Sequence, residues 1–110
     1  MDEATLFTLL KTIGLPVAYH HFTSPPSPPY IVYLVDNGEG RGSDERNEIK
    51  QTGYIVELYT AKKDLASQAK IETLFDERGI DYTFYETFLE SEGLYQGAYH
   101  IESTTKIRRN

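Results

Sequence analysis

The sequence predicts an α+β domain in which two helices pack on one face of a single, mostly antiparallel β-sheet, in the order α-β-β-β-α-β-β. Three observations lead to this prediction. Two segments carry apolar residues at helical spacing, five segments are rich in β-branched and aromatic residues, and polar or glycine-containing turns separate most of them. A length of 110 residues is enough for one buried core, so we expect residues 1–110 to form a single domain.

The first helix is predicted within "MDEATLFTLLKTIGLP", at residues 1–16. Asp2 is the N-cap candidate, because its side chain can accept a hydrogen bond from a free backbone N–H of the first turn. Gly14 suits the left-handed position behind the helix, and Pro16 prevents the helix from continuing. The predicted apolar face has the spacing i, i+3, i+4, i+7 and consists of Leu6, Leu9, Leu10 and Ile13.

The second helix is predicted from Asp64, an N-cap candidate, to Arg78, with Gly79 directly behind it. Its apolar stripe is narrow, which is typical of a helix that lies on a sheet rather than inside a helical bundle. The residues expected in this buried stripe are Leu65, Ile71, Leu74 and Phe75.

Five strands are predicted from runs of β-branched and aromatic residues. They lie in "VAYHHF" (17–22), "YIVYLVD" (30–36), "IKQTGYIVELYTAKK" (49–63), "IDYTFYETFL" (80–89) and "LYQGAYHIES" (94–103). Alternate residues of a strand face opposite sides of the sheet. In the third run one side carries Tyr54, Val56 and Leu58, and the other side carries Ile55, Glu57 and Tyr59. The last two runs form a hairpin around "ESEG", and one face of it carries Tyr82, Phe84, Phe88, Tyr95, Tyr99 and Ile101.

Three connecting or terminal segments complete the chain. Residues 37–48, "NGEGRGSDERNE", contain three glycines and no apolar side chain, which predicts a mobile loop that becomes ordered on assembly. The prolines of "TSPPSPP" (23–29) hold the chain extended and cannot donate to a β-ladder. We therefore expect a stiff, solvent-exposed lead-in, with strand pairing from about Tyr30. Residues 105–110 are predicted to form a short C-terminal tail.

The composition excludes several classes of protein. Lys and Arg number 11 against 17 Asp and Glu, for a net charge of −6, which disfavours a domain that grips nucleic acid through its phosphates. The absence of cysteine excludes a disulfide framework and a thiolate zinc site. No apolar run approaches the ~18 residues of a membrane span, and the acidic start lacks the basic region of a signal peptide. We expect a cytosolic product with no membrane partner.

The candidate chemical motifs are weak. Adjacent strand residues point to opposite faces, so His20 and His21 are not expected to bind one ion, and His100 adds no spacing typical of a metal site. The segment "GEGRG" (38–42) lacks the lysine of a phosphate-binding loop and precedes a strand rather than a helix. No nucleophile with a base and an orienting group can be assembled. We therefore expect no enzyme activity, no cofactor and no metal.

Four blocks of the sequence carry a resemblance to a known family. The blocks "LPVAYHHF", "PPYIVYL", "YIVELYTAKKD" and "ESEGLYQGAYHIE" together resemble a family of small proteins encoded by prophages and long-tailed phages of Gram-positive bacteria. The resemblance runs from about Leu6 to Glu102. Members of that family are described as tail-completion, tail-terminator or head–tail joining proteins.

The resemblance implies a non-enzymatic structural protein of the virion, assembled in the cytoplasm of the bacterial host. Such proteins form a ring, commonly of six subunits, and their partners are further copies of the chain, the tail tube protein and the head-completion or connector proteins. DNA is only passing cargo, and an acidic ring would let the duplex slide. The roles of tail terminator and head–tail joining protein both stay open.

Subunit contacts are expected first in the loop 37–48 and at an exposed tyrosine. The candidate interface residues are Asn37, Glu39, Arg41, Asp44, Glu45, Arg46 and Tyr59. The alternative function is a small protein-binding adaptor that uses the proline-rich segment or an exposed sheet edge. The PxxP patterns favour this alternative, although the basic residue that usually flanks such ligands is missing. A small hydrolase is the third class considered.

Overall fold

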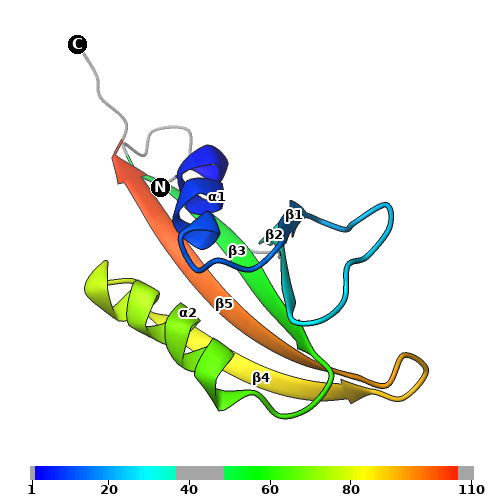
Figure 1. Cartoon of the computed structure of the whole chain (residues 1–110). Helices are drawn as coiled ribbons and strands as arrows, with labels where there is room; N and C mark the ends of the chain where they lie inside the picture. Colours follow the sequence, from blue (N-terminus) through cyan, green and yellow to red (C-terminus); the bar gives the residue numbers. More distant parts are fainter. Residues whose placement is uncertain (1, 37–48, 107–110) are drawn as a thin grey trace.

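The computed structural model describes residues 2–36 and 49–106, of which 49–52 and 103–106 are described by their backbone alone (Figure 1). The elements follow the predicted order α-β-β-β-α-β-β. They are α1 (Glu3–Lys11), β1 (Val17–Tyr19), β2 (Tyr30–Asp36), β3 (Ile49–Thr60), α2 (Leu65–Glu77), β4 (Tyr82–Leu89) and β5 (Leu94–Lys106). Because β5 continues to Lys106, the predicted C-terminal tail begins too early, and its remaining residues lie outside the described part of the chain.

Within the described residues, five strands form one sheet in the order β1-β2-β3-β5-β4. β1 pairs with β2 in parallel, with Val17 opposite Ile31, and the other pairings are antiparallel. The sheet is therefore mixed, and the prediction of a mostly antiparallel sheet is wrong in this respect. Residues 20–29 lead the chain back past β1, and the backbone N–H of Ile31 donates to the carbonyl of Pro16 at 2.8 Å. This contact starts β2 beside the start of β1, so that the two strands run in the same direction.

The last strand of the chain, β5, lies inside the sheet between β3 and β4 (Figure 1). Both neighbours are antiparallel to it, with Val56 opposite Tyr99 and Phe84 opposite Tyr99 on its other side. β3 and β4 are consequently parallel to each other. The helix α2 connects them and crosses over β5, which is inserted between the two strands.

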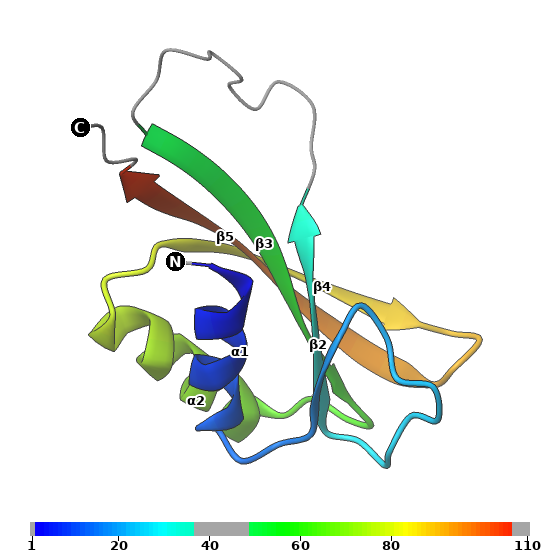
Figure 2. The ribbon, with the colours of Figure 1, turned by 90° about the horizontal axis from the view of Figure 1, so that it is seen from above.

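Both helices lie on the same side of the sheet, as Figure 2 shows. Their fully buried side chains join one core with the alternate strand residues that face them. This core consists of Leu6, Leu10, Ile31, Tyr33, Tyr54, Val56, Leu58, Ile71, Phe75, Tyr99 and Ile101. The predicted stripe of α2 is confirmed for Ile71 and Phe75, whereas Leu65 is 66% exposed and Ser67 is buried in its place. Leu65 is the first residue of the helix.

The helix ends follow the sequence. Asp2 accepts a hydrogen bond from the backbone N–H of Thr5 at 2.8 Å, and Asp64 accepts one from that of Ser67 at 3.0 Å. Gly14 has φ 94° and Gly79 has φ 68°, a conformation that glycine adopts without steric cost. The helices contain 9 and 13 residues. In the described part of the chain, neither is long and apolar enough to cross a membrane.

The proline-rich segment leads into β2 at Tyr30, as predicted, but it is not simply exposed to solvent. Pro26, Pro28 and Pro29 are half-buried. The ring of Phe22 packs edge-on against Tyr30, with the centroids 5.4 Å apart. The segment between β1 and β2 therefore covers one end of the sheet face that the helices leave free, which corrects the expectation of a solvent-exposed lead-in.

Candidate functional site

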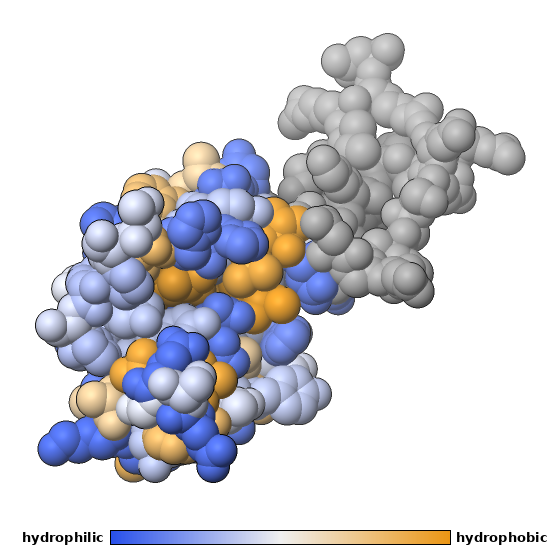
Figure 3. Space-filling model, turned by 90° about the vertical axis from the view of Figure 1, so that its right-hand side faces the viewer, coloured by the Kyte–Doolittle hydropathy of each residue, from blue (hydrophilic) through white to orange (hydrophobic). Residues whose placement is uncertain are grey.

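The sheet face opposite the two helices, here called the open face, is covered by neither helix, although the segment between β1 and β2 covers one end of it. Its residues follow from the strand register, since they alternate with the core residues. They include Val32, Leu34, Ile55, Glu57, Tyr59, Tyr85, Gln96, Ala98 and His100. On the side of the molecule seen in Figure 3, hydrophobic residues gather near the centre of the view, with hydrophilic residues around and among them.

A polar network lies on the open face where β3 and β5 pair. The Tyr59 hydroxyl donates to Glu57 Oε1 at 2.9 Å and accepts from Gln96 Nε2 at 2.8 Å. The ring of Tyr59 stacks on Tyr30, with the centroids 5.1 Å apart and the planes 18° from parallel. All the side chains of this network are half-buried or buried, so that their geometry is fixed by packing rather than by solvent.

The Glu57 carboxylate is the charged group of this network. Burial raises the pKa of Glu57, while the hydrogen bond from Tyr59 and the nearby His100 and His20 lower it in part. Burial likewise raises the pKa of Tyr59 to about 12, so its hydroxyl stays protonated and continues to donate at physiological pH. The open face thus presents a fixed acceptor, Glu57, among apolar and polar neighbours.

The β4 side of the open face carries an exposed aromatic residue. Tyr85 is 60% exposed and packs edge-on against His100, with the ring centroids 5.5 Å apart. A hollow of about 600 Å³ adjoins this pair and includes Asp36, Asp81 and Glu102 in its lining. This part of the open face therefore combines an exposed aromatic ring with acidic residues at its margin.

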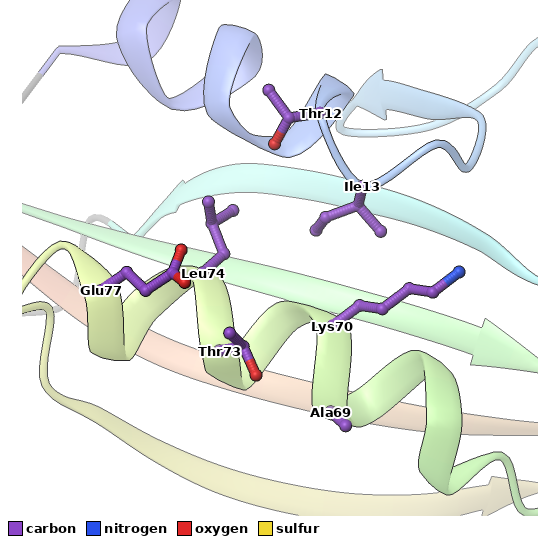
Figure 4. Close-up of a pocket in the computed structure, with 7 residues that line it drawn as sticks. All are labelled: Thr12, Ile13, Ala69, Lys70, Thr73, Leu74 and Glu77. Carbon is purple, nitrogen blue, oxygen red and sulfur yellow. The ribbon is translucent and has the colours of Figure 1, made fainter.

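A second concavity, of about 470 Å³, lies between α1 and α2 (Figure 4). Ile13 and Leu74 point into the space between the helices, and Lys70 and Glu77 lie along α2 at its margin. All the polar residues of its lining are exposed. This groove therefore holds no polar group fixed by burial that would orient a ligand or catalyse a reaction.

The histidines are arranged differently from the prediction. His20 and His21 lie behind β1 rather than within it, so the expectation that they face opposite sides is wrong. Their Nδ1 atoms are 3.1 Å apart, and both side chains are exposed. His100 is half-buried on the open face. In the residues described, no group of three or more His, Cys, Asp or Glu side chains is arranged to hold a metal ion.

Of the predicted interface residues, the structure describes Tyr59 and places it in the network of the open face. The others, Asn37, Glu39, Arg41, Asp44, Glu45 and Arg46, lie outside the described residues, as does the whole predicted loop 37–48. Sequence reasoning missed Glu57 and Gln96 as partners of Tyr59. The signal was a single acid within the apolar run "YIVELY", which is unusual for a residue facing the middle of a sheet.

The comparisons with known proteins add no family to this description. No protein-family model matches the chain, and no curated protein matches it.

Proposed function

We propose that the chain is a non-enzymatic structural protein of a phage or prophage virion, located at the tail end or the head–tail joint. In this proposal it acts as one subunit of a ring through which DNA passes. The resemblance of four sequence blocks suggests the virion role. The observation that carries the proposal is the open face, a broad face of the sheet that neither helix covers.

The composition of the open face supports a subunit contact. Leu34 and Ile55 are half-buried apolar residues beside the network of Glu57 and Tyr59. Protein interfaces combine an apolar, aromatic centre with specific hydrogen bonds, and a stable one buries on the order of 1,000 Å². A closed ring uses heterologous contacts, in which this face docks against a different surface of the next subunit.

The charge of the chain is compatible with DNA passage. The net charge is −6, so a ring of six copies carries −36. Such a ring repels the phosphate backbone rather than binding it. A basic lumen would release counterions on contact and hold the duplex in place. The proposal therefore treats DNA as cargo, not as a ligand.

Electron microscopy of virions that lack the gene tests the role. We expect either tails of uncontrolled length, which indicate a terminator, or full heads beside separate finished tails, which indicate a joining protein. Intact and infectious particles without the gene would refute both. Complementation then tests the surface: Ile55→Asp on the open face should fail to restore particles, whereas Leu65→Asp, a matched change at an exposed apolar residue of α2, should restore them.

The alternative is a protein-binding adaptor that captures an extended segment of its partner. It is favoured by β4, which is an edge strand of eight residues and is available for strand addition. The adaptor role predicts that particles form normally without the gene. The same microscopy therefore separates the two functions.

A further inference from the structure

His20 and His21 are held together by an unusual backbone. The N–H of His21 donates to the carbonyl of Tyr19 at 2.7 Å, across His20, which has φ 69°. This is a γ-turn with a positive φ at its central residue, a rare and strained form. Positive φ is uncommon for any residue other than glycine, and strained residues of this kind cluster at functional sites.

The turn is fixed to the sheet. The backbone N–H of His20 donates to the carbonyl of Tyr33 in β2 at 2.7 Å, which continues the parallel pairing one residue past β1. The ring of Tyr19 lies 6.4 Å from that of His20. The backbone that carries the two imidazoles is therefore held by hydrogen bonds at the end of β1.

The result is a convergent pair of nitrogen atoms. The imidazole rings are perpendicular, with the centroids 5.3 Å apart and Nδ1 of His20 3.1 Å from Nδ1 of His21. Histidine nitrogens bind transition metals at about 2.0–2.1 Å, so two of them on one ion are separated by about 2.9 Å at a right angle and about 3.4 Å in a tetrahedron. The observed separation lies within this range.

We propose that His20 and His21 form a two-imidazole site for a divalent transition-metal ion, which binds to both Nδ1 atoms at once. Imidazole pairs suit Cu²⁺, Ni²⁺ and Zn²⁺, and Cu²⁺ binds the tightest of the three. Water fills the remaining coordination positions, since the described residues supply no group of three ligands. The net charge of −6 attracts a cation to the surface.

Metal binding changes the position of one proton. Without metal, the contact between the two Nδ1 atoms is a hydrogen bond, so one Nδ1 carries a proton and the other accepts it. With metal, both Nδ1 atoms donate their lone pairs to the ion. Each neutral ring then carries its proton on Nε2, and no proton is gained or lost.

Calorimetric titration of the full chain with Cu²⁺ or Zn²⁺ alone tests the site. We expect one ion per chain, with at least 10-fold weaker binding in His20→Asn and in His21→Asn because each leaves a single imidazole. Asn at position 20 keeps the turn, since it tolerates a positive φ. His100→Asn is the matched control and should bind as the wild type does. If the variant that carries both His20→Asn and His21→Asn bound the ion as tightly as the wild type, the proposal would be overturned.

Nuclear magnetic resonance of the unaltered protein with Zn²⁺ gives an independent answer that requires no variant to fold. We expect the Nδ1 signals of His20 and His21 to shift together, with the protons found on Nε2. Shifts at Nε2, at one ring only, or at His100 would refute the geometry.

Discussion

Each face of the sheet carries a hydrogen bond between a tyrosine and a glutamate, but the two bonds lie in different surroundings. On the covered face, Tyr99 is fully buried and its hydroxyl donates to Glu72 of α2 at 2.8 Å. On the open face, Tyr59 makes a similar bond to Glu57, but the pair is only half-buried. The difference teaches that the same tyrosine–carboxylate contact is enclosed by a helix on one face and stays partly accessible to solvent on the other.

The largest expected effect is a loss of stability caused by a substitution on the covered face. Val56→Asp places an unpaired charge at a fully buried position, which costs several kcal/mol against the ~5–15 kcal/mol that stabilise a typical domain. We expect this variant to be unfolded by circular dichroism. Ile55→Asp, on the next residue but on the open face, is the matched control and should stay folded because Ile55 is only half-buried. If both variants melt alike, the two faces do not differ.

A smaller loss of stability is expected when the hydroxyl of either Tyr99 or Tyr59 is removed, and the two losses can be compared directly. Tyr99→Phe removes a buried hydroxyl that bonds to a carboxylate, and we expect a loss of about 1–2 kcal/mol in urea unfolding. Tyr59→Phe should lose less than about 1 kcal/mol, because water can reach the half-buried partners. The reverse order of losses would show that the open face, not the covered one, is the more important for stability.

The smallest effect concerns the pH dependence of stability through Glu57. Burial raises the pKa of Glu57 above its usual 4.5, so the folded state binds this proton more readily than the unfolded state. Wild-type stability relative to Glu57→Gln should therefore fall as the pH rises from about 4.5 through the raised pKa, and the difference should then stay constant. Melting temperatures of both proteins from pH 3.5 to 8 measure this. A difference that grows in the opposite direction would contradict it.

The sequence predicted most of the fold because its signals are local. Asp2, Asp64, Gly14 and Gly79 mark the helix ends through hydrogen bonds and φ angles that involve neighbouring residues. The alternation of residues in β3 correctly assigned Val56 to one face of the sheet, and Glu57 and Tyr59 to the other face. The parallel direction of β1 depends instead on a contact between Pro16 and Ile31, which no local pattern encodes.

The candidate site was predicted less well than the fold. Tyr59 was predicted as an interface residue, but its hydrogen-bond partners were not. One partner lies two residues earlier in β3. The other, Gln96, lies in β5 and reaches Tyr59 only because the two strands pair. His20 and His21 were expected to face opposite sides of the sheet because a continuous strand was assumed. The strand ends at Tyr19, three residues earlier than the composition of "VAYHHF" (17–22) indicates, and the next residue, His20, has a positive φ.

The position of β5 has a consequence for how the protein is made. A ribosome synthesises β5 after β3 and β4, yet both of these strands pair with β5 rather than with each other. Until residues 94–106 have emerged, β4 has no partner strand and one edge of β3 is unpaired, a state prone to aggregation. We therefore expect the sheet to form only after residues 94–106 have emerged, and nascent chains that end at Gly93 to be digested rapidly by protease while chains that include β5 resist.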